Sequence, residues 1–402
     1  MRVFEHVGLQ PEDVVAVALP PGPEWLDIVA GTWEAGAAVF PVDHRMLAAE
    51  ARALLDRARP TVLLDGRGPR RVHGVAAEPQ VALVVHTSGT DGAPKLVEFD
   101  RRAIDAAVAS SALALLATPE DAWICCLPLA HAGGLLVLLR GLLLGAPVRV
   151  HRAFDPAAVA AETDAAFVSI VPTMLVRLLE HRADLSHLRA ILVGGAHLSP
   201  TVRGSAERAG GHVIETYGLT ESCAGVVYDG RPLPGTEMRI NTEGGIELRG
   251  PTLMLGYRFD PVGTAAAFTE DGWLKPGDAG EIDAEGRLHV VGRADELINT
   301  GGENVWPDEV ESALRGHPKI AEIAVGGRLD HEWGQRVVAW VVPTNTADPP
   351  TLEEIRAFAS TSIARHKAPR EIVVVRELPH TFSGKIRRTA LRDGGPSSPD
   401  LE

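Results

Sequence analysis

The first two hundred residues alternate between short apolar runs and Ala-rich segments with helical spacing. Runs rich in Val, Leu and Ile predict strands at 14–19, 61–64, 81–85, 122–127, 148–151, 167–171 and 191–193. The 3.6-residue pattern predicts helices at 48–59, 102–116 and 174–181. This alternation is typical of an α/β fold, here a large N-terminal domain of layered sheets.

The pattern changes twice further along the chain. From about residue 226, short strands separated by glycine turns, as at 236–240 and 245–249, predict a β-rich subdomain. An α+β pattern returns after about residue 295, and the last residues carry Gly, Pro, Ser and acids without apolar periodicity. We therefore expect an N-terminal domain at 1–294, a small mobile α+β domain at 295–393 and a disordered tail at 394–402.

Composition and net charge exclude some kinds of binding partner and indicate the cellular compartment. The chain has 402 residues, is 45% hydrophobic and carries a net charge of −14, which argues against nucleic acid or an anionic membrane as partner. Arg140 interrupts the most apolar stretch, so no membrane insertion is expected, and residues 1–6 do not form a signal peptide. Three cysteines, with Cys125 and Cys126 adjacent, fit neither a disulfide framework nor a zinc site, which favours the cytoplasm.

The most informative stretch follows the apolar run 81–85 and reads His-Thr-Ser-Gly-Thr-Asp-Gly-Ala-Pro-Lys. Its glycines let backbone N–H groups approach an anion, its hydroxyls can donate, and its lysine adds positive charge. A Walker A loop does not fit, because Pro94 precedes the lysine and 96–99 continue as a strand. The alternative is a glycine turn between strands. The phosphate-binding residues predicted here are Thr87, Ser88, Gly89, Thr90, Gly92 and Lys95.

Two further clusters carry chemistry suited to a nucleotide. In 215–221, Gly218 permits a turn, and a carboxylate at Glu221 beside the Thr220 hydroxyl would suit Mg²⁺ near a triphosphate. In 272–278, Asp278 follows a turn and can accept hydrogen bonds from both hydroxyls of a ribose. Each cluster alone could be a solvated loop. Their order and spacing favour a nucleotide site.

These motifs, in this order over nearly the whole chain, resemble those of the acyl-adenylate-forming superfamily, in its acyl-CoA synthetase branch. The family's phosphate loop matches 87–95, its aromatic-gate segment 127–134 and its Tyr-Gly-x-Thr-Glu motif 217–221. Besides the loop residues, the resemblance implies ATP or AMP contacts for Gly195, Ala196, Tyr217, Gly218, Thr220, Asp278 and Arg293.

The resemblance also implies roles in the C-terminal part. Lys385 matches the family's catalytic lysine, which would act with Thr220 and Glu221, the latter also holding the metal. Asp295 matches the interdomain hinge. The pantetheine tunnel for CoA matches Gly301, Gly302, Glu303 and Asn304.

The implied activity is that of an AMP-forming carboxylic acid:CoA ligase that uses ATP, Mg²⁺ and CoA. The acid would attack the α-phosphate, and a thiol would then attack the acyl-adenylate. Positioned cations, Lys385 among them, would stabilise the charge of the first step. A domain hinged at Asp295 would then replace Lys385 with the thiol tunnel.

Two positions depart from the family loop. Asp91 stands where the family usually has Thr, and Leu96 stands where it has Gly. An acid beside the triphosphate is expected to lower ATP affinity, unless Asp91 turns away to bond the loop or helps to hold Mg²⁺. The segment ahead of 14–41 is also short for the family, so we expect the first sheet to lack some elements.

Two parts of the sequence, the gate segment and the predicted pocket wall, indicate the class of acid substrate. Residues 124–139 contain no acid, which favours a free carboxylic acid over an α-amino acid. Small residues at 194–196 leave room for a flat ring. The residues 220–235 and the compact length resemble short actinobacterial o-succinylbenzoate:CoA ligases of menaquinone synthesis. The implied pocket wall includes His131, which could instead be a packing histidine, and Ser169, Val171, Gly194, Gly195 and Cys223.

Three alternatives remain at this point. The enzyme could be a fatty-acid:CoA ligase, or a stand-alone adenylating enzyme that loads an acyl-carrier protein. A non-catalytic nucleotide binder is compatible with Asp91 but is opposed by the retained Lys385, Glu221 and Asp278.

Overall fold

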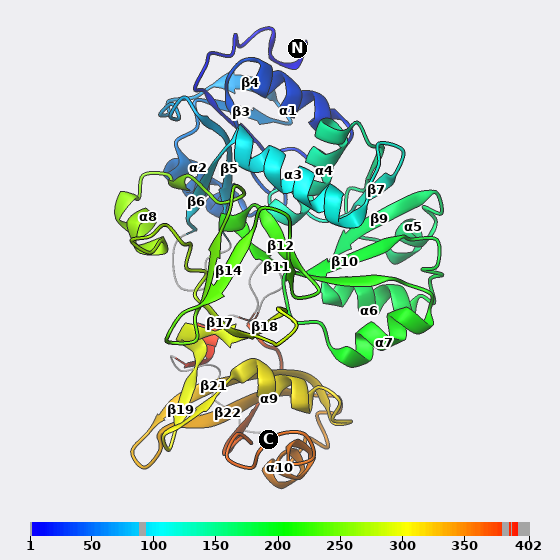
Figure 1. Cartoon of the computed structure of the whole chain (residues 1–402), viewed down its shortest axis with the longest axis vertical. Coiled ribbons are helices and arrows are strands. Elements are labelled where there is room, and N and C mark those ends of the chain that lie inside the picture. The colour runs from blue at the N-terminus through cyan, green and yellow to red at the C-terminus, as the bar shows by residue number, and fades with distance from the viewer. Residues whose placement is uncertain (1, 88–93, 380–385, 387, 393–402) are drawn as a thin grey trace.

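The computed structural model describes residues 2–87, 94–379, 386 and 388–392. Two seven-stranded sheets form most of the upper part of the molecule in Figure 1. In spatial order, the first sheet contains β16 (Gly256–Tyr257), β6 (Leu96–Asp100), β5 (Val81–His86), β2 (Ala38–Pro41), β1 (Val14–Val17), β3 (Val62–Asp65) and β4 (Gly68–Arg71). The second contains β13 (Arg231–Pro232), β12 (Ala224–Tyr228), β11 (Val213–Leu219), β10 (Ala190–Gly194), β9 (Ala165–Ile170), β7 (Ala122–Cys125) and β8 (Val148–Val150).

Helices fill the space between the sheets and cover their outer faces. The helices α1 (Glu24–Glu34), α3 (Arg101–Leu115) and α4 (Ala132–Leu144) share one buried cluster with strands of both sheets. The helix α2 (Ala48–Ala58) covers the outer face of the first sheet. The outer face of the second sheet is covered by α5 (Pro156–Ala160), α6 (Pro172–Glu180) and α7 (Pro200–Arg208).

The continuous apolar run of β1 follows from burial on both faces of the first sheet. Val15 and Val17 point into the core between the sheets, whereas Val14 and Ala16 join the core under α2. Successive side chains of a strand alternate between faces, so a strand covered on both sides must be apolar throughout. The pairing of β1 with β2 and β3 is parallel, as such runs indicate.

A β-rich region and a smaller α+β part complete the chain. The former holds the hairpins β14 (Glu237–Ile240) with β15 (Ile246–Arg249) and β17 (Asp278–Ile282) with β18 (Leu288–Arg293), and also α8 (Pro261–Ala267). Short 3-10 turns lie at η1 (Arg2–Phe4), η2 (Thr220–Ser222) and η3 (Ala294–Glu296). The last sheet contains β20 (Glu303–Val305), β19 (Ile298–Thr300), β22 (Gly334–Pro343) and β21 (Ile320–Asp330), and β23 (Glu371–Val374) also pairs with β22.

The C-terminal sheet is covered on both faces and lies below the rest of the molecule in Figure 1. The helices α9 (Pro307–Leu314) and α10 (Leu352–Ala359) pack on one face. On the other face, Leu391 of α11 (Arg388–Arg392) packs against β21 and β22. The domain boundaries expected at 294 and 393 stay predictions, and the tail 394–402 lies outside the described residues.

The predicted α/β class is confirmed, and all seven apolar runs form strands. The three predicted helices form within two residues of their expected ends. The helices α1, α4 and α7 were not predicted from the sequence. The helix α4 carries an apolar surface all round because it lies between two sheets, and such a helix lacks the amphipathic stripe that marks surface helices. Within the described part of the chain, no helix is both long and apolar enough to span a membrane.

Truncation of a side chain between the sheets should destabilise the whole fold. Ile104 of α3 is 0% exposed in the central core, so Ile104→Ala should lower the free energy of unfolding by about 2 to 5 kcal/mol. Leu113 of the same helix is 61% exposed, and Leu113→Ala should change stability by less than about 0.5 kcal/mol. Urea denaturation of the two variants checks the difference. Equal losses would show that α3 is not the buried central helix described above.

Candidate active site

A cavity of about 3380 Å³ lies where the carboxyl ends of the central strands face the C-terminal part. The carboxyl ends of parallel strands are where α/β folds commonly bind ligands. Residues just after β5, β9, β10 and β11 contribute to its wall. The sequence-predicted residues that line it are Thr87, Lys95, His131, Val171, Gly195, Ala196, Tyr217, Gly218, Thr220, Glu221, Asp278 and Arg293.

The predicted phosphate loop is closed at its neck by two hydrogen bonds. The Thr87 amide donates to the Lys95 carbonyl at 2.8 Å, and the Lys95 amide donates to Thr87 Oγ1 at 3.1 Å. Leu96, one of the two departures from the family loop, is 1% exposed and begins β6 opposite His86. An apolar residue at 96 is therefore part of the sheet core. The loop residues Ser88, Gly89, Thr90, Asp91 and Gly92 lie outside the described residues.

Tyr257 joins Lys95 to Glu221 and was not predicted from the sequence. Its hydroxyl donates to Glu221 Oε1 at 2.8 Å, and Lys95 Nζ lies 4.4 Å from the centre of its ring. Burial, aided by the Glu221 carboxylate, raises the pKa of Tyr257, so the hydroxyl remains a donor at neutral pH. One signal was available in the sequence, since the chain has only three tyrosines.

A second hydrogen-bonded group forms around Asp278, at the start of β17. The Tyr217 hydroxyl donates to Asp278 Oδ2 at 2.8 Å, and Arg293 Nη1 lies 3.3 Å from Asp278 Oδ1. Arg293 Nη1 also donates to the Pro276 carbonyl at 2.8 Å. Burial, together with the nearby carboxylate, raises the pKa of Tyr217 well above its usual range. Asp278 is thus held in position between two donors.

The corner between β11 and η2 requires glycine. A Cβ at Gly218 would clash with the carbonyl oxygen of Ala224 on the neighbouring strand. The close approach of these two strands directs the chain into η2, which carries Thr220 and Glu221. Gly218 itself lies within β11, at a register shift against β12, so the close approach of the two strands, and not the predicted turn, requires glycine here.

The predicted acid-pocket residues separate into two groups. Gly195 has φ +81°, which favours glycine, and an added Cβ would lie 3.5 Å from Val171 Cγ1, so these two residues meet at the cavity wall. Gly194 lies against Thr216, where a side chain would clash. Ser169, Gly194 and Cys223 are not among the described residues that line the cavity. Cys223 is instead 3% exposed in the central core, where burial raises the pKa of its thiol to about 12.

His131, the first residue before α4, lies beside a second histidine. The ring centres of His131 and His86 are 5.8 Å apart. Burial, with His131 adding to it, lowers the pKa of His86 to about 4, so His86 is neutral. His86 ends β5 directly before the predicted phosphate loop, so the two histidines connect that loop to the gate segment.

The predicted hinge residue lies in η3, and the predicted CoA residues lie at the hairpin of β19 and β20. Arg293 Nε donates to Asp295 Oδ1 at 3.3 Å, at the start of η3. Gly301 and Gly302 form the turn between β19 and β20, and Glu303 and Asn304 begin β20; all four are exposed and are not among the described lining residues. Gly301 approaches Trp333, to whose carbonyl its amide donates at 2.8 Å. Lys385 lies outside the described residues.

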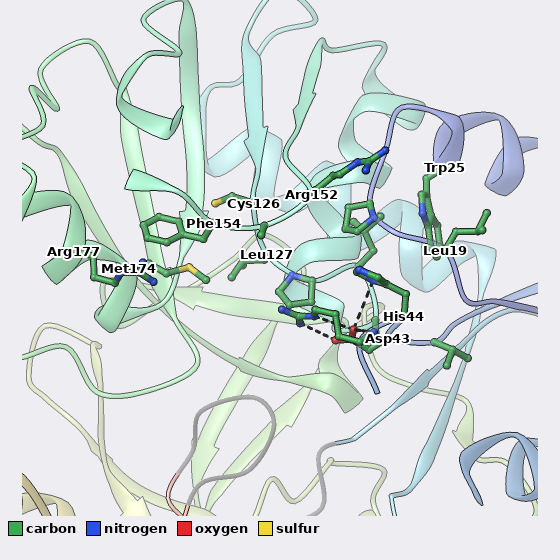
Figure 2. A pocket seen from close by; sticks show the side chains of 17 residues that line it. Leu19, Trp25, Asp43, His44, Cys126, Leu127, Arg152, Phe154, Met174 and Arg177 are labelled. Carbon is green, nitrogen blue, oxygen red and sulfur yellow. Dashed lines mark hydrogen bonds and ion pairs between the residues drawn. The ribbon is translucent and has the colours of Figure 1, made fainter. Parts of the chain in front are cut away.

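A smaller cavity of about 230 Å³ lies beside the large one (Figure 2). It is lined by residues 127–130 of the predicted gate segment but by none of the predicted nucleotide-binding residues, and Arg45, Leu127, Pro128 and Met174 line both cavities. Arg45 donates to both oxygens of Asp43, from Nε at 3.0 Å and from Nη2 at 2.8 Å. Burial acts to raise the pKa of Asp43, but the hydrogen bonds from Arg45 hold it below its usual value. This pocket supplies no group for the predicted chemistry.

Comparison with known protein families agrees with the site. The model of the AMP-binding enzyme family matches residues 2–79 and 65–258, and the model of the AMP-binding enzyme C-terminal domain matches residues 309–385.

Similar proteins carry one recurring name. A probable 2-succinylbenzoate–CoA ligase of Mycobacterium tuberculosis H37Rv is 39% identical over 379 residues, which cover 91% of this chain and 97% of that protein. The 2-succinylbenzoate–CoA ligase of Bacillus velezensis is 31% identical over 441 residues, covering 98% and 90%.

Solved structures agree in fold and in bound molecules. The o-succinylbenzoate CoA synthetase (MenE) of Bacillus subtilis, in complex with the acyl-adenylate intermediate, has a TM-score of 0.87 and 28% identity, covering 96% of this chain and 89% of that one. The same enzyme with ATP and magnesium has a TM-score of 0.86 at 28% identity, with coverage of 95% and 90%. The predicted class of enzyme, an AMP-forming acyl-CoA ligase, is confirmed. This chain belongs to the AMP-binding enzyme family.

Proposed function

We propose that this enzyme joins 2-succinylbenzoate to CoA with conversion of ATP to AMP and pyrophosphate. The single observation that carries the substrate is the similarity to the M. tuberculosis ligase along nearly the whole length of both chains. The geometry around Asp278 and Glu221 supports the adenylation chemistry.

In the first step, a carboxylate oxygen of the acid attacks the α-phosphorus of ATP, and the bond to pyrophosphate breaks. Asp278 is placed to accept hydrogen bonds from the ribose, because Tyr217 and Arg293 hold its carboxylate in the cavity wall. Lys95 contributes positive charge at the neck of the phosphate loop. These groups position the nucleotide, and positioning with charge stabilisation is the main requirement of phosphoryl transfer.

The residues present fit a magnesium ion bound mainly through the nucleotide. Tyr257 occupies Oε1 of Glu221, and Oε2 makes no hydrogen bond to a described residue. No group of three or more His, Cys, Asp or Glu side chains suited to a metal occurs in the described part of the chain. Mg²⁺ commonly binds through one or two carboxylates, substrate phosphates and water, so Glu221 alone suffices. When bound, the ion neutralises charge on the phosphate oxygens.

In the second step, the CoA thiolate attacks the acyl carbon and AMP leaves. Ile386 and Arg388, which follow Lys385, line the cavity, whereas the turn 301–304 faces solvent. This arrangement supports assigning the structure to the adenylation step, in which Lys385 acts. The proposed rotation at Asp295 would bring the turn 301–304 to the cavity for the second step.

The acid pocket is compatible with an aromatic substrate. Gly195 and Val171 face the cavity from the ends of β10 and β9, and Gly195 projects no side chain into it. A flat ring fits such a wall better than a branched headgroup does. His131 lines the same cavity and is placed to meet the acid at the gate.

Pyrophosphate release with a panel of acids tests this function. We expect release with 2-succinylbenzoate, and CoA thioester when CoA is added. Benzoate, a medium-chain fatty acid and an α-amino acid should give at most about one hundredth of that kcat/KM, because their missing contacts each cost binding free energy. Higher activity with the fatty acid would favour a fatty-acid ligase. Adenylate without transfer to CoA would favour loading of a carrier protein.

Asp278→Ala should weaken the use of ATP more than it alters the chemical step. The loss of charge-assisted hydrogen bonds to the ribose should cost about 1.5 to 3 kcal/mol and should appear in the KM for ATP. Asp283, at the far end of the same hairpin, pairs with His289, and Asp283→Ala serves as the control. An unchanged KM for ATP in Asp278→Ala would contradict the ribose assignment.

Tyr257→Phe should raise the Mg²⁺ concentration needed for half-maximal adenylation. Without the hydroxyl, Glu221 loses the donor that orients it, and orienting partners of metal ligands typically contribute about tenfold or more in affinity. Tyr228 bonds Ser111 in the core, so Tyr228→Phe should lower stability but leave the Mg²⁺ requirement unchanged. A Mg²⁺ titration of pyrophosphate release compares them, and equal requirements in parent and Tyr257→Phe would refute this role of Tyr257.

A further inference from the structure

A buried arginine with three carboxylate partners lies close to the predicted catalytic lysine in the sequence. Arg388 Nη1 donates to Glu296 Oε2, and Nη2 donates to Asp308 Oδ1 and to Glu311 Oε1, each at 2.8 Å. The Arg388 side chain is 15% exposed and that of Glu311 is 2% exposed. We call Arg388, Glu296, Asp308 and Glu311 the C-terminal anchor.

The C-terminal anchor joins elements that are far apart in the chain. Glu296 ends η3, directly after the predicted hinge, and Arg388 begins α11. Glu311 of α9 also accepts a hydrogen bond from the Val325 amide of β21 at 2.8 Å. Burial raises the pKa of Glu311 to about 6, against the opposing effect of the Arg388 guanidinium. A planar guanidinium that pairs with several fixed carboxylates holds a defined geometry.

The other side of the hinge is held by separate contacts. Arg293 donates to the Pro276 carbonyl, and the Ala294 amide donates to the Gly277 carbonyl at 2.9 Å. The backbone is thus fixed up to residue 294 on one side and from Glu296 onward on the other. Asp295 lies between these two sets of contacts, and among the described residues its side chain is bonded only by the exposed Arg293 side chain, which supports its predicted hinge role.

We infer that Arg388 is a positioning residue for the adenylation step, and this inference rests on the proposed function. Lys385 precedes Arg388 by three residues, a span of at most about 10 Å even for an extended chain. Ile386, between them, packs in the core that α11 shares with β21 and β22. We therefore expect the C-terminal anchor to limit how far Lys385 can lie from the hinge at Asp295. The rotation at this hinge would bring Lys385 to the nucleotide.

Separate measurement of the two half-reactions tests this role. In Arg388→Met, the kcat of acid-dependent pyrophosphate release should fall about tenfold or more, because small displacements of catalytic groups cost up to about a hundredfold. The KM for ATP and thioester formation from synthetic acyl-adenylate should each change less than about threefold, since neither depends on the lysine. Lys385→Ala gives the largest loss expected, about a hundredfold to a thousandfold.

A matched control removes a different ion pair from the C-terminal part of the chain. Lys319 Nζ lies 2.9 Å from Glu354 Oε1 of α10 and 2.9 Å from Asp348 Oδ1, and neither Lys319 nor these two carboxylates line the large cavity. Lys319→Met should adenylate like the parent. Equal losses in both half-reactions of Arg388→Met, or the same loss in Lys319→Met, would overturn the inference and leave Arg388 as a stability contact. Glu296→Ala is a milder variant that removes only the link from Arg388 to the hinge, and it should reduce adenylation in the same direction.

Amide hydrogen exchange decides the question independently of activity. Exchange in residues 296–300 and 388–392 should rise at least about fivefold in Arg388→Met and in Glu296→Ala, but not in Lys319→Met, because these segments lose a shared anchor. Unchanged exchange in 296–300 would overturn the inference. If the parent released no pyrophosphate with any acid, the proposed function would fail, while the exchange result would still show whether the anchor exists.

Discussion

The buried layer of helices between the two large sheets is the constraint on which the site depends. Side chains from α1, α3 and α4 fill this layer, together with both inner sheet faces. The layer sets how the carboxyl ends of the two sheets stand relative to each other. Tyr257 belongs to the first sheet, and Glu221 lies between β11 and β12 of the second, so their hydrogen bond depends on how the layer places the two sheets. The cavity is thus a product of packing some distance from it.

The charges of the site are held by local pairs of side chains. A chain with a net charge of −14 provides no general attraction for a triphosphate. The structure instead pairs each described site carboxylate with a fixed donor, Tyr257 for Glu221 and both Tyr217 and Arg293 for Asp278. Paired acids can then contact sugar or metal, and Lys95 stands at the loop neck for the phosphates.

Much of the fold could be predicted because strand burial and turn chemistry are local properties. The runs at β1 and β5 stand out since both faces of the sheet are apolar, whereas the approach of Ala224 that requires Gly218 is visible only in the folded chain. Tyr257 could not be found in this way, because its partner Glu221 is 36 residues away and only the tertiary fold brings them together. Arg388 could not be found in this way either, because its carboxylate partners are also far away in the sequence. The resemblance implied Cys223 in the pocket wall, whereas in the structure Cys223 has φ +56° and its side chain lies in the central core.

The burial of the three cysteines has a practical consequence for following the enzyme at work. Cys125, Cys126 and Cys223 are all buried, and burial raises the pKa of Cys126 and of Cys223 to about 12. Thiols in this state hardly form the thiolate that alkylating dyes and spin labels require. The natural chain therefore behaves toward such reagents as a nearly thiol-free background. A single cysteine introduced on each side of Asp295 would accept a fluorophore pair without prior removal of any native residue, so the distance between the two parts could be recorded during turnover.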